Sequence, residues 1–424
     1  MKSRQLVITI MNRCLLVIPL LVGVNCWASQ ETKFERSVTQ HVTSIGCSDG
    51  VATKMISLVS QWKMPNKSNT IVAWEAKLSA SAQDKANVAA NRLEVCVSIA
   101  KMISQTFRPG DPFDLADVLD SKQAQCVGYS QLFWVVANAL DIQTTILTVE
   151  RYSDLERVPK FGHVCCLSSL SPEESVMVDI SYGPMAGKSL VSKPFKLQDL
   201  YRNTGDLFQL RDESNPLMLH RAFRRLDTQG IISTVLCNKA FILDSQKKYN
   251  DALSFYQKAM KISSLDAGEL NNMATTLHSL RRNDEALDAI RQSITLRPTY
   301  APAHHNLGNI LRDMQKQQEA IAAYEKAVAL DDKLKEAWVN LGVCYYVSGA
   351  DKKAVAALEK AHTLQPTDAQ VLLHLGTAYG FVGETRKAQE ALRRAIRLNP
   401  ACSSKARSIQ AFLAKQGVKV TLKD

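Results

Sequence analysis

The sequence has few of the residues that make tight turns, with 18 glycines and 13 prolines among 424 residues. An all-β chain needs many such turns, so this scarcity favours helices. Long apolar runs are also rare. Only the run from Cys14 to Ala28 approaches a membrane span, and it is shorter than the roughly 18–20 residues that a span needs. The composition therefore excludes a multi-pass membrane protein, a collagen and a disordered tail.

Motifs for nucleotides, metals and nucleic acids are missing as well. The sequence has no phosphate-binding GxxxxGK[ST], no strand-linked GxGxxG and no zinc-type Cys/His spacing. His304 and His305 form the one close histidine pair, and adjacent residues of a helix point in different directions. The net charge of +11 comes without a run of Lys and Arg. We therefore predict no cofactor, no metal and no nucleic-acid partner.

The segment 1–28 has the pattern of a secretory signal peptide. Lys2, Arg4 and Arg13 precede a short apolar core, and the small residues Ala28 and Ser29 follow it. We expect cleavage after Ala28, which makes the mature chain an exported protein, periplasmic or secreted. The alternative is an uncleaved leader that tethers the chain to a membrane.

Eight cysteines remain after such a cleavage, which is too few for a disulfide scaffold in a chain of this length. Cys47 and Cys96 could form a bridge in an oxidising compartment. Cys237 and Cys344 fall inside regular repeats, where a buried structural thiol is expected.

Small residues recur with a period of 34 from Ser233 onward. They are needed where two antiparallel helices touch, and Pro298, Pro366 and Pro400 end three of the second helices. One register holds only alanine: Ala252, Ala286, Ala320, Ala354 and Ala388. The pattern resembles the tetratricopeptide repeat family, with five units at 233–266, 267–300, 301–334, 335–368 and 369–402. A helix from Ser403 to Gln416 is expected to cover the last unit.

One polar register stands out in the first helix of each unit. Its members are Asn238, Asn272, Asn306, Asn340 and, in the fifth unit, His374. This column resembles the asparagine ladder in which some tetratricopeptide proteins hold a peptide backbone, because an amide offers both a donor and an acceptor. The resemblance implies a protein or peptide partner on the concave face. The alternative is that these amides only cap or hydrate the groove between helices.

The middle of the chain has one group of residues suited to catalysis. Cys126 lies at the start of an amphipathic helix, where the helix N-terminus favours a thiolate and free backbone N–H groups could hold an oxyanion. Strands are expected at 144–150, 163–167 and 176–181. A hairpin centred on residue 171 would place His163 opposite Asp179 on one face of the sheet, which Cys165 shares. A nucleophile, a base and an orienting acid would then meet in one α+β unit.

This stretch, roughly 90–200, resembles the transglutaminase-like cysteine domain. Gln125-Cys126 at a helix start, Gly162-His163 at a strand start and Val178-Asp179 one strand later carry the resemblance. It implies a papain-like α+β fold in which Cys126 attacks an amide carbonyl, with Gln125 beside the oxyanion. His163 would exchange the proton, and Asp179 would fix the imidazole. Val127 stands where animal transglutaminases have a tryptophan, which favours a degenerate domain as the alternative.

The expected fold class is mainly α, with a small α+β transglutaminase-like domain followed by an α-solenoid of five tetratricopeptide units. The expected function is an exported cysteine hydrolase or transamidase that acts on an amide or peptide bond, with repeats that recruit a protein or peptide. The alternative is a non-catalytic adaptor. The expected segments are a signal peptide at 1–28, a helical region at 29–90, the transglutaminase-like domain at 91–200, a connector at 201–232, the repeats at 233–402, and a capping helix and tail at 403–424.

Overall fold

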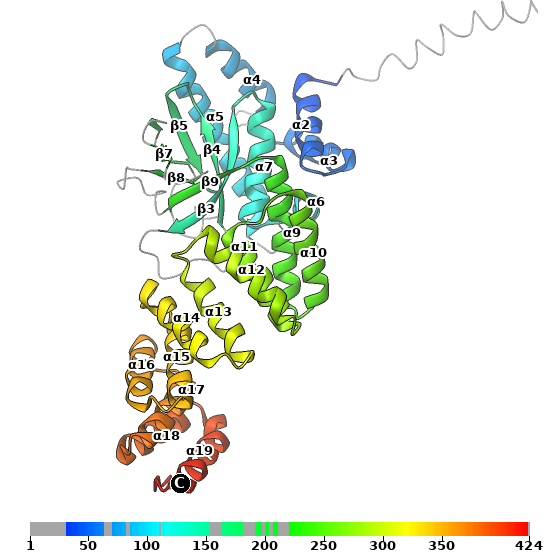
Figure 1. Ribbon diagram of the computed structural model, residues 1–424. Helices are drawn as coiled ribbons and strands as arrows, with labels where there is room; N and C mark the ends of the chain where they lie inside the picture. The colour runs from blue at the N-terminus through cyan, green and yellow to red at the C-terminus, as the bar shows by residue number, and fades with distance from the viewer. Residues whose placement is uncertain are drawn as a thin grey trace, which may run out of the picture. The chain divides into compact units, whose positions relative to one another are not determined.

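The computed structural model describes residues 31–62, 70–81, 85–109, 112, 114–152, 163–180, 191–192, 194–196, 200–202, 207–210 and 220–422. The predicted signal peptide at 1–28 lies outside these residues. The described chain forms two compact units (Figure 1). The first unit holds the residues up to 152 together with 163–228, and the second holds the residues from 229 to the C-terminus.

The first unit combines helices with a sheet. Its helices are α2 (Lys33–Ser44), α3 (Asp49–Ser60), α4 (Thr70–Ser81), α5 (Lys85–Thr106), α6 (Leu115–Ser121) and α7 (Cys126–Ala139). Its strands are β1 (Arg108–Pro109), β2 (Gln123–Ala124), β3 (Thr144–Tyr152), β4 (His163–Ser169), β5 (Glu174–Val178), β6 (Phe195–Lys196), β7 (Leu200–Arg202), β8 (Leu207–Leu210) and β9 (His220–Leu226). Seven of these strands form one antiparallel sheet in the order β6-β5-β4-β3-β9-β8-β7.

Helix α7 is the central helix of this unit and is buried on nearly all sides. Residues 126–139 are almost entirely apolar, which suits a helix that packs on β3 and β4 along one side and on α2 and α5 along others. Gly128 permits the close approach of α6, because a Cβ at this position would lie 2.7 Å from a methyl of Val118. This packing fixes the N-terminal end of α7, where Cys126 is the first residue.

The hairpin of β4 and β5 has a different register from the predicted one. Cys166 pairs with Val178 and Leu167 with Met177, so the continuation of the ladder places Asp179 opposite Cys165. The prediction that His163 lies directly opposite Asp179 is wrong by two residues. The cause is the turn, which is closed by bonds from the N–H groups of Leu170 and Ser171 to the carbonyl of Glu174 and is therefore centred on residue 172. A shift of two residues leaves His163, Cys165 and Asp179 on the same face of the sheet.

The segment 201–232 is not a connector in the structure. It supplies parts of β7, β8 and β9 to the sheet, and its end begins α9 (Thr228–Ser245). Strand β9 pairs with β3 through partners such as Ile146 with Leu226. The bridge between Cys47 and Cys96, which the sequence left open, is absent, since the described cysteines form no disulfide.

The second unit consists of paired helices that follow one another along the chain (Figure 1). After α9 come α10 (Tyr249–Ile262), α11 (Ala267–Ser279), α12 (Asn283–Leu296), α13 (Ala301–Asp313), α14 (Gln317–Leu330), α15 (Lys335–Val347), α16 (Asp351–Leu364), α17 (Ala369–Phe381), α18 (Thr385–Leu398), the short 3-10 helix η2 (Pro400–Cys402) and α19 (Ser403–Lys415). Each predicted repeat unit corresponds to one helix pair, although α9 begins at Thr228, before the predicted start at 233. Helix α19 begins at the predicted Ser403 and ends one residue before the predicted Gln416.

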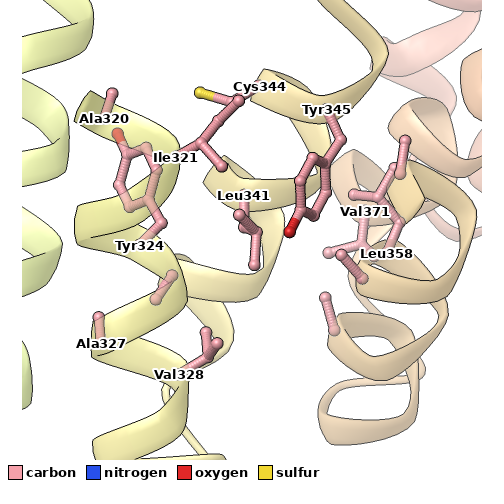
Figure 2. Packing of buried hydrophobic residues seen from close by; sticks show 14 of the residues in the cluster. Ala320, Ile321, Tyr324, Ala327, Val328, Leu341, Cys344, Tyr345, Leu358 and Val371 are labelled. Carbon is pink, nitrogen blue, oxygen red and sulfur yellow. The ribbon is translucent and has the colours of Figure 1, made fainter. Parts of the chain in front are cut away.

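Close contact inside each pair explains the small-residue registers. A Cβ on Gly308 of α13 would lie 2.5 Å from the ring of Tyr324 on α14, and one on Gly376 of α17 would lie 2.6 Å from Leu392 on α18. Larger side chains fill the space between consecutive pairs. Figure 2 shows Ile321 and Tyr324 of α14 beside Leu341 of α15 in this core. Cys237 and Cys344 are buried in these cores, as predicted.

No helix of the described chain combines the length and the hydropathy that a membrane span requires. The described side chains also form no group of three or more His, Cys, Asp or Glu residues that is suited to a metal ion.

Candidate functional site

The first helices of successive repeat units pack beside one another. Helix α11 contacts α13, α13 contacts α15, α15 contacts α17, and α17 contacts α19. We call the side of the second unit formed by these five helices the first-helix face. The predicted asparagine column lies on these helices, apart from Asn238, which lies on α9.

Side-chain amides on the first-helix face are joined by hydrogen bonds across the helices. Asn306 on α13 donates to Asn271 on α11 over 2.8 Å, and Asn340 on α15 donates to Asn309 on α13 over 2.9 Å. Within α13, Asn309 donates to Asn306 over 3.5 Å. We call these four residues the amide network. It links three consecutive repeat units through groups that each keep further hydrogen-bonding capacity.

Two further side chains, Tyr324 and His305, form hydrogen bonds with the amide network. The buried hydroxyl of Tyr324 donates to the Asn309 oxygen over 2.7 Å. The amide of Asn340 also lies 3.0 Å from Nε2 of His305, which accepts its second proton. Burial lowers the pKa of His305, with the Glu336 carboxylate opposing that shift, so the ring is neutral near pH 7 and can accept.

The column predicted from the sequence is only partly joined in this way. Asn306 and Asn340 are central to the network, and Asn272 accepts a bond from Asn271 over 3.3 Å. His374 takes another role, because it stacks on Tyr346 with ring centroids 6.4 Å apart, and its Nδ1 shares a hydrogen bond of 3.3 Å with that residue's hydroxyl. Asn238 is 9% exposed, which leaves little of it accessible to a ligand.

Asn271, His305 and Asn309 contribute to the network but were not predicted. The sequence carries a signal for each of them. Asn271 and His305 occupy the same register in consecutive repeat units. Asn309 lies three residues after Asn306, on the same side of α13.

The aromatic end of the first-helix face was not predicted either. Tyr346 on α15 contacts Phe381 on α17, and Phe381 contacts Phe412 on α19, with centroids 5.9 Å apart in both pairs. We call these three residues the aromatic row. Its sequence signal is again a spacing, since Phe381 follows His374 by seven residues, which is two helical turns.

The predicted cysteine site lies in the first unit, at the N-terminal end of α7. Cys126 is partly exposed there. One turn later, the Ser130 hydroxyl donates to the carbonyl of Val164 over 3.3 Å, and the Cys166 thiol donates to the carbonyl of Ser130 over 3.4 Å. These bonds place the first turns of α7 over the beginning of β4, the strand that starts at His163.

Asp179 and Cys165 belong to the same region. Asp179 directly follows β5 and is 1% exposed. Burial raises the pKa of the Cys165 thiol well above its usual value, and the Asp179 carboxylate raises it further. The register of β4 and β5, whose continuation places Asp179 opposite Cys165, agrees with this interaction. The backbone of His163 pairs with Val149, whereas its side chain lies outside the described part of the chain.

Gln125 occupies the N-cap position of α7. Its backbone N–H donates to the carbonyl of Pro112 over 2.8 Å, so this N–H is engaged and would not hold an oxyanion. The predicted role of Gln125 as an oxyanion neighbour therefore rests on its side chain or on the N–H groups that follow it in α7.

Known families and structures match the repeat half of the chain. Residues 308–349 match the family described as TPR repeat, and residues 233–264, 270–300, 335–368 and 369–402 match the family described as tetratricopeptide repeat. The C-terminal half of the chain therefore consists of tetratricopeptide repeats. The transglutaminase-like resemblance of the middle stays a prediction. A comparison with curated proteins gave no match.

The solved structures compared below each cover less than half of this chain. The crystal structure of YrrB, described as a TPR protein with an unusual peptide-binding site, is 23% identical over 43% of this chain and 91% of its own, with a TM-score of 0.36. MamA from Desulfovibrio magneticus is 20% identical over 40% and 97%, with a TM-score of 0.37. TTC0263 from Thermus thermophilus is 18% identical over 43% and 99%, with a TM-score of 0.36.

Proposed function

We propose that this protein is a binding adaptor that holds a protein or peptide segment on the first-helix face of its repeats. The observation that carries the proposal is the amide network. It presents side-chain amides from three consecutive first helices in one connected row. An extended peptide has main-chain N–H and C=O groups to satisfy along its length, and amides can pair with either.

The geometry gives each amide a definite role. The described contacts use both amide protons of Asn340, for Asn309 and for His305, so its oxygen is the group offered to a peptide N–H. Asn306 gives one amide proton to Asn271 and keeps a second for a peptide carbonyl. Because neighbouring side chains already hold these groups, binding would cost little rotamer entropy.

The proposal is tested by peptide binding to the full chain. Peptides selected from a random library would be measured against Asn306→Ala with Asn340→Ala, which should lose binding by about a hundredfold for two interface hydrogen-bonding residues. The matched control is Gln292→Ala with Gln318→Ala, since both are exposed amides on second helices. Unchanged affinity in the first double variant would contradict the proposal, and Cys126→Ser should leave binding intact.

A second candidate function is cysteine-dependent cleavage or transfer of an amide bond in the first unit. It is supported by the position of Cys126 at the start of α7, by the bonds that set α7 over β4, and by the strand register whose continuation places Asp179 opposite Cys165. The Cys126 sulfur would bond to the amide carbonyl carbon as the C–N bond breaks. His163 would pass the thiol proton to the leaving amine, and water or a second amine would then release the thioester.

The two candidates differ in which residues they need. Catalysis requires Cys126 and His163 and predicts that Cys126→Ser abolishes function in the cell, whereas the adaptor needs Asn306 and Asn340. A thioester trapped between Cys126 and the acyl group of a small amide substrate would support the second candidate. Full function of Cys126→Ser would exclude it.

We also propose that the mature chain is exported. The support is the sequence of the segment 1–28, with Lys2, Arg4 and Arg13 before an apolar core. N-terminal sequencing of the protein from cells tests this proposal. A mature chain that begins near Ser29 agrees with it, whereas retention of Met1 in a membrane fraction favours the tethered alternative.

A further inference from the structure

The type of side chain on the first-helix face changes from one helix to the next along the second unit. The residue seven positions after each member of the asparagine column lies two turns further along the same face of its helix. In α13, α15 and α17 this position is Asp313, Val347 and Phe381, and the same register in α19 holds Lys415. One face therefore carries, in order, a carboxylate, an aliphatic side chain, an aromatic ring and an ammonium group.

The apolar part of this face is exposed to an unusual degree. Val347 is 65% exposed and Phe412 is 44% exposed, although both side chains are large and apolar. Phe412 contacts the half-buried Phe381 of the aromatic row, and Val347 directly follows the half-buried Tyr346 at the end of α15. Adjacent exposed apolar groups from α15, α17 and α19 make a surface that gains free energy when another apolar side chain covers it.

The C-terminal end of the second unit is strongly basic. Residues 385–422 contain nine Lys or Arg and one Asp or Glu, a formal charge of +8, out of +11 for the whole chain. The preceding three units at 267–368 contain twelve basic and thirteen acidic residues, a formal charge of −1. The basic charge is thus concentrated in the last helices, with five of the nine basic residues on the second helix α18 and three on α19, whereas it is nearly cancelled in the units that hold the amide network.

Two of these basic residues flank Phe412 on α19. Lys415 is three residues after Phe412, on the same side of the helix, and is exposed. Lys405 is exposed as well, and its charge acts on His374 of α17, whose pKa is lowered mainly by burial. The two lysines therefore lie on the same side of α19 as Phe412, about one turn after it and two turns before it.

We propose that the aromatic row, Val347, Lys405 and Lys415 form a subsite for an acidic peptide segment that carries a large apolar residue. This subsite deepens the proposed adaptor function and rests on it. The apolar side chain would cover Tyr346, Val347, Phe381 and Phe412, and neighbouring carboxylates would meet the two lysines. The peptide main chain would continue along the same face to Asn340 and Asn306.

An acidic peptide fits this face better than a nucleic acid or an anionic membrane. A polyanion would use the lysines but would leave the apolar surface uncovered and the amide network unused. A peptide with acidic and apolar residues at one end and an ordinary main chain beyond them uses every part of the face.

The test is a selection of random dodecapeptides on the full chain, followed by affinity measurements at low and high salt. The selected peptides should be enriched in Asp and Glu beside Phe, Trp or Leu. Lys405→Glu with Lys415→Glu should weaken binding of a selected peptide by about tenfold and reduce its salt dependence. Phe412→Ala should weaken binding by about tenfold without changing the salt dependence.

The control variant is Lys326→Glu with Lys352→Glu. It makes the same change of net charge at exposed lysines on the second helices α14 and α16 and should leave affinity within about twofold. Circular dichroism of each variant verifies the fold, which is expected to persist because the substituted side chains are exposed.

Three outcomes would overturn the inference. Selected peptides without an acidic bias, or affinity unaffected at Lys405 and Lys415, would contradict the subsite while leaving the adaptor function in place. Equal competition by phosphatidylserine vesicles or single-stranded DNA, insensitive to Phe412→Ala, would show a general polyanion surface instead. Failure to select any peptide would overturn both the subsite and the adaptor function.

Discussion

The side-chain amide of Asn340 on α15 donates to the side-chain oxygen of Asn309 on α13 over 2.9 Å. The same oxygen accepts the hydroxyl of Tyr324 from α14. The Asn309 oxygen thus joins three helices of two repeat units, within the face on which a peptide is proposed to bind. The network is therefore part of the packing of the repeats as well as a candidate binding surface.

Removal of this acceptor should destabilise the repeats. In Asn309→Ala, the buried Tyr324 hydroxyl loses its partner, which should cost about 1–3 kcal/mol, whereas Tyr324→Phe should cost about 1 kcal/mol. The double variant should cost less than the sum, because the orphaned hydroxyl is gone. Hydrogen exchange of peptides from α13 and α14 measures the loss of stability in the two single variants and in the double variant. Strictly additive losses would contradict the coupling between Asn309 and Tyr324.

The turns between the helices of each pair offer a second test. Gln315 has a φ of +63° and Gly349, one repeat later, a φ of +76°. A left-handed backbone costs a non-glycine residue about 1–2 kcal/mol. Gln315→Gly should therefore raise local stability by about 0.5–1 kcal/mol, and Gly349→Ala should lower it by a similar amount or more.

The cost at Gly349 is expected to come from the backbone alone, because a Cβ there would have nothing within 4 Å. Gly50→Ala on α3 is the control, since an added Cβ there would make only an ordinary contact of 3.6 Å with Ser48. Urea unfolding followed at Trp338 on α15 reports on the repeats. A loss of stability in Gln315→Gly would contradict the account of this turn.

Acidification should weaken the repeats. Burial lowers the pKa values of His305 and His374 below the ordinary value, despite the opposing carboxylates of Glu336 and Asp368. Above pH about 6.5 both rings are neutral in the folded and unfolded chain. As the pH falls below that value, the unfolded chain takes up protons more readily, so the free energy of unfolding decreases until the lowered folded-state pKa values are passed.

The measurement is the urea midpoint of the repeats between pH 7.5 and 5. His305→Gln with His374→Gln should show a smaller loss over this interval than the natural sequence. An identical pH dependence in the two proteins would mean that other groups cause it. Arg312 and Lys405, whose charges also lower these pKa values, are left in place in both proteins.

The cysteines of the first unit should differ sharply in reactivity. Burial raises the pKa of Cys96 to about 12 and raises that of Cys165 well above its usual value, so neither thiol should be alkylated in the folded chain. Cys126 is partly exposed at a helix N-terminus and should react with iodoacetamide at near-neutral pH. Peptide mapping by mass spectrometry separates the three sites.

If His163 acts as a base toward Cys126, His163→Ala should slow alkylation of Cys126 by about tenfold or more, the usual scale for a base that acts on its nucleophile. His220→Ala, on β9, is a suitable control. A Cys126 that reacts slowly, or equally in both variants, would remove the support for the second candidate function and leave the adaptor.

The repeat half of the chain was predictable because its determinants are local and recur. A period of 34 with small residues in fixed registers specifies helix pairs, and α19 begins at the predicted Ser403. The hydrogen bonds of Asn271, His305 and Asn309 were not predicted, since they depend on how neighbouring first helices are offset. That offset is a property of the stacked units and not of any single one.

The sheet was predicted less completely, for physical reasons that differ between strands. Strands β3 to β5 are rich in Val, Ile and Leu and were expected. Strand β9 contains three arginines within His220–Leu226, so its pairing with β3 determines its conformation more than its own composition does. The register error between β4 and β5 came from a turn centred one residue later than assumed, which moves a strand pairing by two.

The central claim is that a partner binds the first-helix face of the repeats. Hydrogen exchange of the full chain, with and without a selected peptide, tests it most directly. The account predicts slower exchange in α13, α15 and α17, with no change in the second helices α14 and α16 or in the first unit. Protection of the second helices, or of α7 and β4 alone, would contradict it.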